Sequence, residues 1–296
     1  MSASEPVISV VVPTKGRLSS LERCLEALRK ADFGREQFEV VVANDRGGEP
    51  VESLVASFAD ELQVAIARPQ RAGPSAARNA GAAAARGAYV AFTDDDCEPA
   101  PSWLPALERS LEQNPGAAVG GRVENGMPQN LGAVATQVVV DALHAQFNQD
   151  PRSPRFFASS NVAFPADAFR SVGGFDEGFP YAEDREVCER WVRTGHRFVS
   201  APDAVVIHIR TLELREFIAQ HYGYGRGARA FHRSRFPKER RVDRLGMLRE
   251  LARETLRHHD HHGRLAVAGY VALSQFATAS GFAREAVGAL GSPRRG

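Results

Sequence analysis

The sequence is poor in cysteine and has almost no net charge. Its 296 residues include 3 cysteines, an odd number without a CxxC pair, at positions Cys24, Cys97 and Cys188. Neither a disulfide framework nor a thiolate metal site is therefore indicated, and a reducing compartment is the default. Lys and Arg total 37 and Asp and Glu total 36, so the formal net charge is +1. This balance gives no global basic field, and we expect no nucleic-acid partner.

Long uninterrupted hydrophobic runs are also missing. The most apolar long stretch, residues 265–290, is interrupted by Ser, Thr, Gln, Arg and Glu, and it falls short of the ~20 apolar residues that a spanning helix needs. The first residues lack the basic region and the cleavage site of a secretory signal. We therefore expect a cytoplasmic protein without a membrane span, with peripheral attachment at the inner face of the membrane as an open option.

Short apolar runs alternate with helix-length segments over the N-terminal third of the chain. The runs cover residues 7–12, 38–43, 62–67 and 88–92, and the segments between them cover about 18–30, 50–58 and 74–85. The runs are continuous rather than alternating in hydrophobicity, which is typical of parallel strands covered on both faces. We therefore predict an α/β fold with a mostly parallel central sheet flanked by helices.

The C-terminal part of the chain has a different character. A predicted strand ends near residue 209, and the sequence from residue 212 onward is mainly helical. We expect one α/β domain over residues 1–210 and a helical extension over residues 211–296. Between residues 226 and 244 the extension is rich in Arg and Lys. This stretch is either a solvated helix face or a contact to substrate or to anionic lipid headgroups, with nucleic acid as a minor alternative.

Polar residues follow the predicted strands at the point where each strand ends. They are Pro13 and Thr14, Asn44 and Asp45, Arg68, and the triplet Asp94, Asp95 and Asp96. The carboxyl ends of parallel strands meet at one rim, where ligands bind in open α/β sheets. In an extended segment Asp94 and Asp96 point to one side, and a hard divalent ion such as Mg²⁺ or Mn²⁺ would offset their repulsion. The alternative is an acidic turn before the helix that starts near residue 102.

Four further residues each have a functional and a structural interpretation. Arg78 lies in the first turns of a small-residue helix, where it could bind phosphate or serve packing alone. Glu183 and Asp184 open another helix, where a carboxylate could act as a general base or only as a cap. His208 lies in a predicted strand and is either a metal ligand or a core histidine. We expect the histidine-rich run at residues 258–262 to be a solvated surface segment and assign it no role.

Four segments in a fixed order carry a resemblance to a known family. They are ISVVVPTKGRLSSLERCLEAL at residues 8–28, FEVVVANDRG at 38–47, AGPSAARNAGAAAARGAYVAFTDDDCEPAPSWL at 72–104 and GGFDEGFPYAEDREVCERWVRTGHR at 173–197. These segments resemble the opening strand and helix, the nucleotide-binding acid, the DxD region and the acceptor-side ED motif of the inverting family 2 glycosyltransferases. The resemblance implies the GT-A fold, a Rossmann-like sheet, as a nucleotide-sugar-binding and catalytic domain over residues 1–210.

The resemblance also assigns roles to individual positions. It implies that the donor nucleotide is bound by Pro13, Thr14, Asp45, Arg78, Asp94 and Asp95. It implies that Mg²⁺ or Mn²⁺ is held by Asp94, Asp96 and His208. Asp184 would be the catalytic base, and Glu183 would support the acceptor site.

The activity that the resemblance implies is the transfer of one sugar with inversion. The donor would be a nucleotide sugar, with a UDP-sugar favoured, and the acceptor would be a hydroxyl of a glycan, a lipid or a small molecule. The sequence lacks the QxxRW motif of processive members, and it has Asn44 before Asp45 where an acidic pair is common. Two alternatives are a non-catalytic nucleotide-sugar-binding protein that docks through its extension and a nucleotidyltransferase.

Overall fold

The computed structural model describes residues 5–46, 49–179, 181–233, 243–258 and 262–288. The chain forms two compact units. Unit 1 comprises Met1–Glu124, Asp150–Gly178 and Asp184–Ile209, and unit 2 comprises Asn125–Gln149, Phe179–Glu183 and Arg210–Gly296.

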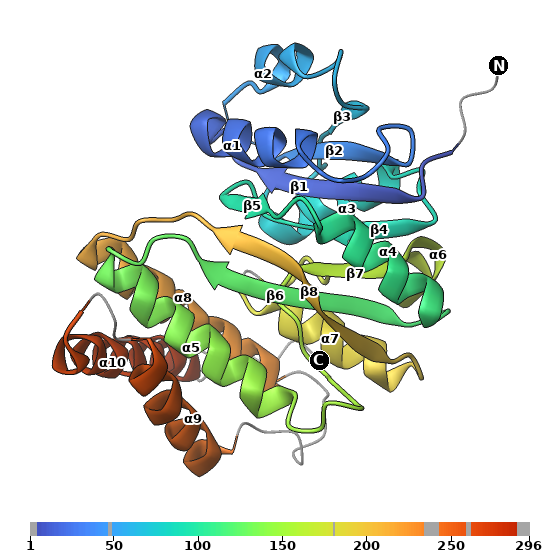
Figure 1. The fold of residues 1–296 in the computed structure, drawn as a ribbon. Coiled ribbons are helices and arrows are strands. Elements are labelled where there is room, and N and C mark those ends of the chain that lie inside the picture. The colour runs from blue at the N-terminus through green and yellow to red at the C-terminus, as the bar shows by residue number, and fades with distance from the viewer. Residues whose placement is uncertain (1–4, 47–48, 180, 234–242, 259–261, 289–296) are drawn as a thin grey trace. The chain divides into compact units, whose positions relative to one another are not determined.

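Unit 1 is built on an eight-stranded sheet with the order β3-β2-β1-β4-β7-β6-β8-β5 (Figure 1). The strands are β1 (Ile8–Thr14), β2 (Phe38–Asn44), β3 (Val64–Ala67), β4 (Tyr89–Phe92), β5 (Cys97–Pro99), β6 (Ala118–Asn125), β7 (Val162–Pro165) and β8 (Phe198–His208). The pairs β3–β2, β2–β1 and β1–β4 are parallel, as predicted. The pairs β4–β7, β7–β6 and β8–β5 are antiparallel, so the whole sheet is mixed.

Helices cover the parallel part of the sheet on both faces. The helices that begin in unit 1 or lie at its border are α1 (Leu18–Arg29), α2 (Glu52–Ser57), α3 (Pro74–Ala84), α4 (Trp103–Gln113), α6 (Ala166–Val172) and α7 (Glu183–Arg193). Val10 and Val12 of β1 share a buried cluster with residues of α1. Val11 points the other way, and a Cβ on Gly81 of α3 would lie 2.4 Å from its Cγ1. Glycine at this position therefore lets α3 approach β1 closely.

The described residues of unit 2 form a group of four long helices. They are α5 (Leu131–Phe147), α8 (Leu214–Arg233), α9 (Arg244–Arg257) and α10 (Arg264–Gly288). Val138 of α5, Phe217 of α8, Leu251 of α9 and Val267 of α10 belong to one buried cluster. Helix α5 thus packs with the C-terminal helices, although it precedes the predicted border at residue 210. The functional division at that border stays a prediction.

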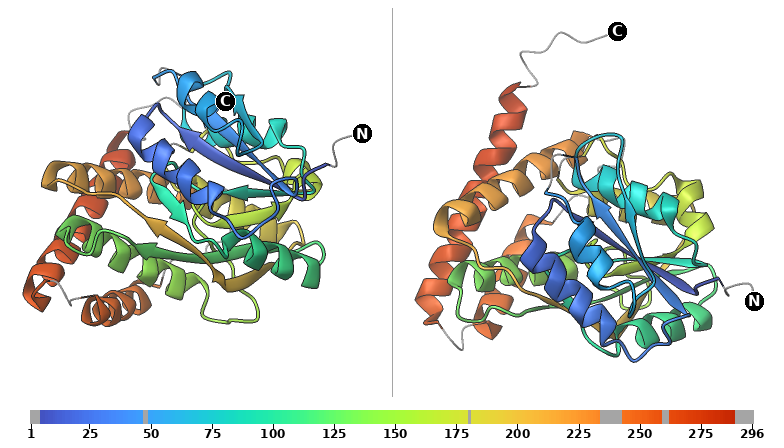
Figure 2. Two further views of the ribbon diagram at one scale, coloured as in Figure 1. Left: turned by 45° about the horizontal axis from the view of Figure 1, so that its top comes forward. Right: turned by 90° about the horizontal axis from the view of Figure 1, so that it is seen from above.

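Helices α8 and α10 lie side by side (Figure 2). A Cβ on Gly225 would lie 1.9 Å from the carbonyl oxygen of Thr278, so the two backbones touch there. Two arginines of the basic stretch also contact α10 from α8. Arg226 Nε bonds Glu285 Oε1 at 2.7 Å, and the Arg229 guanidinium lies 5.4 Å from the centre of the Phe282 ring. These two side chains hold α8 to α10, whereas residues 234–242 of the stretch lie outside the described residues.

A buried histidine makes unit 2 sensitive to acid. His221 is 0% exposed, its Nε2 lies 3.2 Å from Thr136 Oγ1, and burial lowers its pKa from 6.5 to about 4. Below its ordinary pKa the unfolded chain binds a proton that the folded chain does not bind, so stability falls as the pH drops from 6.5 toward 4. At a pH of about 4, we expect His221 to lower the free energy of unfolding by about 3 kcal/mol. Urea unfolding across this pH range should show that the free energy of unfolding falls more steeply with falling pH in the wild type than in His221→Gln. Equal slopes in the two proteins would contradict the assignment.

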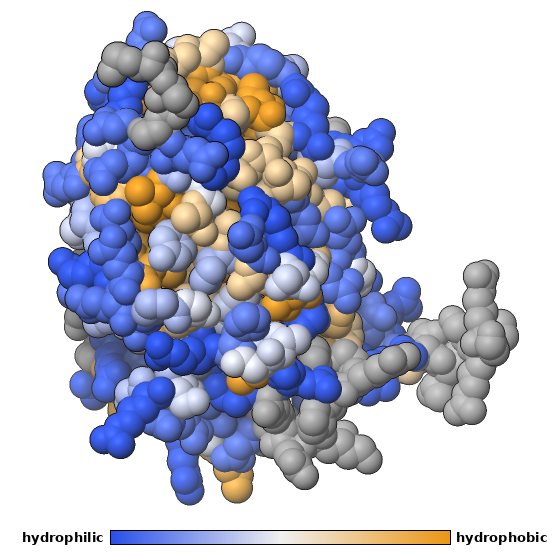
Figure 3. Space-filling view, turned by 90° about the vertical axis from the view of Figure 1, so that its right-hand side faces the viewer, coloured by the Kyte–Doolittle hydropathy of each residue, from blue (hydrophilic) through white to orange (hydrophobic). Residues whose placement is uncertain are grey.

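One described helix meets the length and composition of a membrane span. This helix is α10, over Arg264–Ala286. Core helices of soluble proteins also meet this length and composition. On the face drawn in Figure 3, hydrophobic side chains form small groups between hydrophilic ones. That mixture is ordinary for the surface of a globular protein.

Candidate active site at the carboxyl ends of the strands

The acidic triplet after β4 meets the end of β1. Because β1 and β4 are parallel neighbours, their carboxyl ends lie at the same edge. Asp95 is 0% exposed, and its Oδ2 accepts hydrogen bonds from Thr14 Oγ1 at 2.6 Å and from Arg17 Nε at 3.2 Å. Burial raises the pKa of the Asp95 carboxyl, an effect that Arg17 and Thr14 oppose. The carboxylate thus anchors the loop to β1, and its predicted contact with the donor stays a prediction.

Arg17 joins two acids of the triplet. Its guanidinium pairs with Asp95 and donates from Nη1 to Asp96 Oδ2 at 2.9 Å, while almost half of the Arg17 side chain remains exposed. The charges of Asp96 and Asp95 raise the pKa of Arg17 against the opposing effect of burial. One cation therefore offsets the repulsion between neighbouring carboxylates. The sequence interpretation missed this residue, although TKGR at residues 14–17 places Arg17 three residues after the end of the first strand.

Arg78 and Asp94 form a second ion pair at this edge. Arg78 Nη2 lies 2.7 Å from Asp94 Oδ1, and the Arg78 side chain is 6% exposed against 27% for Asp94. The guanidinium also lies 5.6 Å from the centre of the Phe175 ring. A buried cation in the first turns of α3 thus stands beside a partly open carboxylate. This arrangement suits an anionic group bound at the helix start.

Asp96 and His208 form the part of the site that fits a metal. His208 Nε2 lies 3.3 Å from Asp96 Oδ1, and β5–β8 pairing puts His208 opposite Cys97. One ligand atom from each of these residues lies within 4.8 Å of the others. Burial and the charges of Asp94 and Asp96 raise the pKa of the Cys97 thiol, so a thiolate ligand is disfavoured. Carboxylate oxygens with one imidazole fit Mn²⁺, and the carboxylates alone fit Mg²⁺.

Asp45 ties three segments together. Its backbone N–H donates to the Thr14 carbonyl at 2.8 Å, and its Oδ1 accepts from the backbone N–H of Arg46 at 2.8 Å and of Gly73 at 2.9 Å. The side chain therefore links the end of β2 to the turn before α3. Pro13 lies buried within β1.

Two buried hydroxyls near this edge lack a hydrogen-bond partner among the described residues. They are Oγ of Ser75, in the first turn of α3, and Oγ1 of Thr93, directly before the acidic triplet. Ser75 is 2% exposed and Thr93 is 0% exposed. Buried polar atoms are almost always paired in folded proteins. A polar ligand at the start of α3 would account for the Ser75 hydroxyl.

Glu183 and Asp184 begin α7, and the division of the chain into the two units falls between these residues in the sequence. Asp184 Oδ1 accepts from the backbone N–H of Arg185 at 2.7 Å, and both acids are half-buried. Burial lowers the pKa of Arg185 to about 10 against the effect of Asp184. Ala182, just before them, has a φ of 63°, which costs energy for a residue with a Cβ. Such strain is often found next to functional residues.

A second group with metal-ligand chemistry lies in unit 2. His258 Nε2 is 2.8 Å from Asp141 Oδ2, and Glu254 lies near both. Arg253 Nε and Arg257 Nη1 both donate to Glu254 Oε1, at 3.1 and 3.0 Å. The hydrogen bond that His258 donates to the Asp141 carboxylate raises the pKa of His258. We interpret this group as ionic pairing of α5 with α9; residues 259–261 of the histidine-rich run lie outside the described residues.

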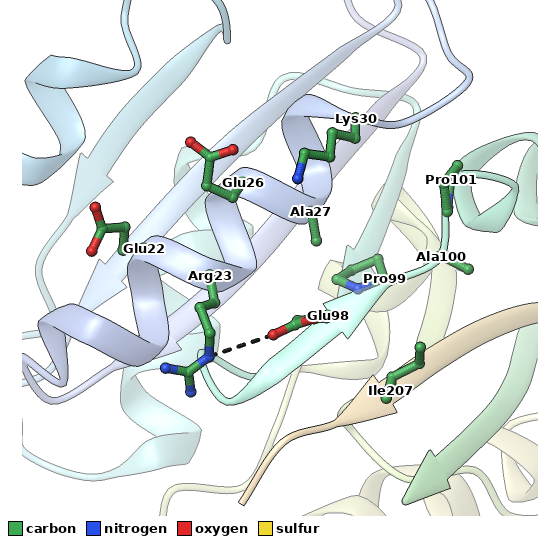
Figure 4. A pocket seen from close by; sticks show the side chains of 10 residues that line it. All are labelled: Glu22, Arg23, Glu26, Ala27, Lys30, Glu98, Pro99, Ala100, Pro101 and Ile207. Carbon is green, nitrogen blue, oxygen red and sulfur yellow. Dashed lines mark ion pairs between the residues drawn. The ribbon is translucent and has the colours of Figure 1, made fainter. Parts of the chain in front are cut away.

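A hollow of about 480 Å³ lies between α1, β5 and β8 (Figure 4). Arg23 extends from α1 toward Glu98 of β5, and Arg23 Nε lies 3.4 Å from Glu98 Oε1. None of the predicted site residues lines this hollow. It is therefore separate from the carboxyl-end site.

Comparison with known proteins identifies the family. The family model described as "Glycosyl transferase family 2" matches residues 9–173, more than half of the chain. The chain belongs to glycosyltransferase family 2. A second model, "Glycosyl transferase family group 2", matches residues 104–283 of this family 2 chain. The resemblance that the sequence motifs indicated is thereby confirmed.

Named relatives of this family 2 chain are glycosyltransferases. It is 32% identical over 231 residues to the pre-mycofactocin glycosyltransferase of Mycobacterium tuberculosis, covering 75% of this chain and 46% of the relative. It is 26% identical over 214 residues to glycosyltransferase AglE of Haloferax volcanii, covering 70% of this chain and 68% of the relative. The chain thus spans about half the length of the mycobacterial relative.

Solved structures show the same fold. The mannosyltransferase PcManGT from Pyrobaculum calidifontis, in complex with GDP-Man and Mn²⁺, matches with a TM-score of 0.60 and 20% identity over 99% of this chain and 83% of its own. S. aureus TarS 1-349 in complex with UDP matches with a TM-score of 0.53 and 16% identity over 97% and 93%. The predicted GT-A fold with a helical C-terminal region is confirmed.

Proposed function

We propose that the chain transfers a single sugar, as a hexosyltransferase, from a nucleotide sugar to an acceptor hydroxyl. The observation that carries the proposal is the convergence of Thr14, Arg78, Asp94, Asp96 and His208 at one edge of the sheet. Family membership and the names of the relatives support it. A UDP-sugar is the favoured donor. Neighbouring structures contain GDP-Man, UDP or UDP-GlcNAc, so the base is left to experiment.

In the proposed donor site, Pro13, Thr14 and Asp45 hold the base and ribose, with Asp94 and Asp95 beside them. Arg78 lies near the diphosphate, where its buried charge meets the phosphate oxygens without competition from bulk water. Asp94, Asp96 and His208 would hold Mn²⁺ or Mg²⁺. Such an ion, when bound, neutralises charge that develops on the departing nucleoside diphosphate.

In the proposed chemical step Asp184 removes the proton from the acceptor hydroxyl. The freed oxygen attacks the anomeric carbon from the face opposite the diphosphate, and the bond from that carbon to the diphosphate oxygen breaks. The configuration is inverted, and the diphosphate leaves with the electron pair. Glu183 supports the acceptor. We further propose that residues 1–210 act as the catalytic domain, that residues 211–296 contact the acceptor or a membrane surface, and that the protein works in the cytoplasm or at the inner face of the membrane.

Turnover is tested by release of the nucleoside diphosphate. Wild-type protein is incubated with each nucleotide sugar and Mn²⁺, with and without panels of glycan, lipid and small-molecule acceptors. The proposal predicts release that requires one donor class and rises with a suitable acceptor. Donor binding without release under any acceptor would favour the non-catalytic binding alternative.

His208 gives a prediction for the metal. Its imidazole lies 3.3 Å from Asp96, so His208→Ala should weaken Mn²⁺ binding in the presence of donor by about tenfold or more. The free Mn²⁺ signal in electron paramagnetic resonance measures this affinity directly. The matched control is His196→Ala, because His196 stacks on Trp191 at 4.1 Å and has no place in the proposed site. Equal Mn²⁺ affinity in both variants would remove His208 from the ligand set.

A further inference from the structure

Helix α9 carries an apolar stripe on its exposed side. Leu245, Leu248, Ala252 and Leu256 follow one another at helical spacing, so they lie on one side of the helix. The three leucines are 69%, 60% and 57% exposed. Leu251, about a quarter of the way round the helix from this stripe, is 4% exposed and belongs to the buried cluster of unit 2. The helix has therefore buried one apolar face and presents a second one outward.

A row of arginines runs beside the leucine stripe. Arg249, Arg253 and Arg257 are four residues apart, which puts them next to the leucines on the helix surface. The side chains of Arg253 and Arg257 are 48% and 63% exposed, and both pair with Glu254, whose side chain is only 5% exposed. Arg253 also pairs with Glu250, whose side chain is 23% exposed. Both acids are thus less exposed than the guanidinium groups that they pair with. The exposed edge of α9 is therefore basic.

Helix α10, which packs against α9, also leaves apolar surface outside. Its residues 265–283 contain no charged side chain. Leu265 is 90% exposed and Phe276 is 72% exposed. Only 28% of its most apolar window is buried. Single exposed apolar side chains are common on protein surfaces, whereas a row of them along one helix face is typical of an interaction surface.

We propose that the leucine stripe and the arginine row of α9 form a docking surface for an anionic phospholipid bilayer. The leucines would enter the boundary between headgroups and acyl chains, and the arginines would meet the anionic headgroups. Charge complementarity selects this partner, because leucines flanked by arginines match a surface that is apolar below and negative above. The inference makes the membrane contact proposed for residues 211–296 specific to one helix face and one class of lipid, and it does not depend on sugar transfer.

The test is flotation of the full chain with lipid vesicles. The chain should float with vesicles of phosphatidylcholine and phosphatidylglycerol and should bind vesicles of phosphatidylcholine alone far less. Leu245→Ser combined with Leu248→Ser and Leu256→Ser should reduce binding by about tenfold or more. Arg249→Gln combined with Arg253→Gln and Arg257→Gln should give a similar loss and should abolish the salt dependence of what remains.

A charge-matched control separates the docking surface from general attraction. Arg23→Gln combined with Arg109→Gln and Arg122→Gln removes the same charge from unit 1, where these side chains are 44%, 58% and 59% exposed. This control should float like the wild type. Circular dichroism and donor-induced stabilisation should be unchanged in the leucine variant, which keeps a failure of docking distinct from a failure of the proposed function.

Three outcomes would overturn the proposal. They are absence of flotation with anionic vesicles, equal flotation of the wild type and the leucine variant, and a soluble dimer that dissociates when the leucines are replaced. The last outcome would assign the stripe to a second copy of the chain.

Discussion

Replacing Asp184 by Asn is expected to lower kcat by about 10²- to 10⁴-fold, the usual contribution of a general base. The amide cannot accept the acceptor proton, but its oxygen can still accept the 2.7 Å hydrogen bond from the Arg185 backbone N–H. The start of α7 should therefore keep its structure. Stabilisation by donor and Mn²⁺ should be unchanged, because the donor residues lie on other elements. The rate of nucleoside diphosphate release in the presence of acceptor gives the measurement.

Asp176→Asn is the matched control for that experiment. Asp176 Oδ1 likewise accepts from a nearby backbone N–H, that of Gly178 at 2.8 Å, and the residue is exposed. Its replacement makes the same change from carboxylate to amide, and the side chain accepts a backbone hydrogen bond as Asp184 does. Near-wild-type turnover in Asp184→Asn would show that another group accepts the proton. A comparable loss in Asp176→Asn would trace the effect to the loop instead of the base.

Arg17→Gln is expected to lower the free energy of unfolding by about 2 kcal/mol. Asp95 is 0% exposed, and without the guanidinium its charge would keep only the hydrogen bond from Thr14. Removing one partner of a fully buried ion pair costs about 3–5 kcal/mol. Arg17 is 46% exposed, so water replaces part of its effect and the expected loss is smaller. Urea unfolding monitored by circular dichroism measures the change.

A second substitution tests the cause of that loss. Asp95→Asn removes the charge that Arg17 compensates, so the double variant should lose less stability than the sum of the single variants, by about 1–2 kcal/mol. Arg23→Gln is the control, because its pairing with the 34% exposed Glu98 is a surface contact. That change should cost less than about 1 kcal/mol. Strict additivity of Arg17→Gln and Asp95→Asn would contradict the proposed pairing.

The sequence predicts the parallel part of the fold well, because local patterns determine it. Continuous apolar runs correspond to β1, β2, β3 and β4, and the acids after these runs lie where the strands end. The rim is predictable for the same reason, since parallel neighbours end at one edge.

The parts that the sequence does not predict depend on contacts between distant segments. Strand β5 is three residues long and pairs with β8, far along the chain, and only that register puts Cys97 opposite His208. Helix α5 joins the C-terminal helices through buried contacts that its own periodicity does not reveal. Arg17 lies beside the acidic triplet because β1 and β4 are neighbours. Its role therefore becomes visible only in the folded chain.

The proposed function requires the acidic edge to bind a nucleotide sugar together with a metal ion. It is tested most directly by thermal unfolding of the wild type and of Asp96→Ala with UDP-, GDP-, dTDP- and CMP-sugars, each with and without Mn²⁺. We expect a rise in Tm with one donor class, UDP-sugars first, that requires Mn²⁺ and is lost in Asp96→Ala. A folded wild type whose Tm does not respond to any donor, or a response that Asp96→Ala retains, would contradict it.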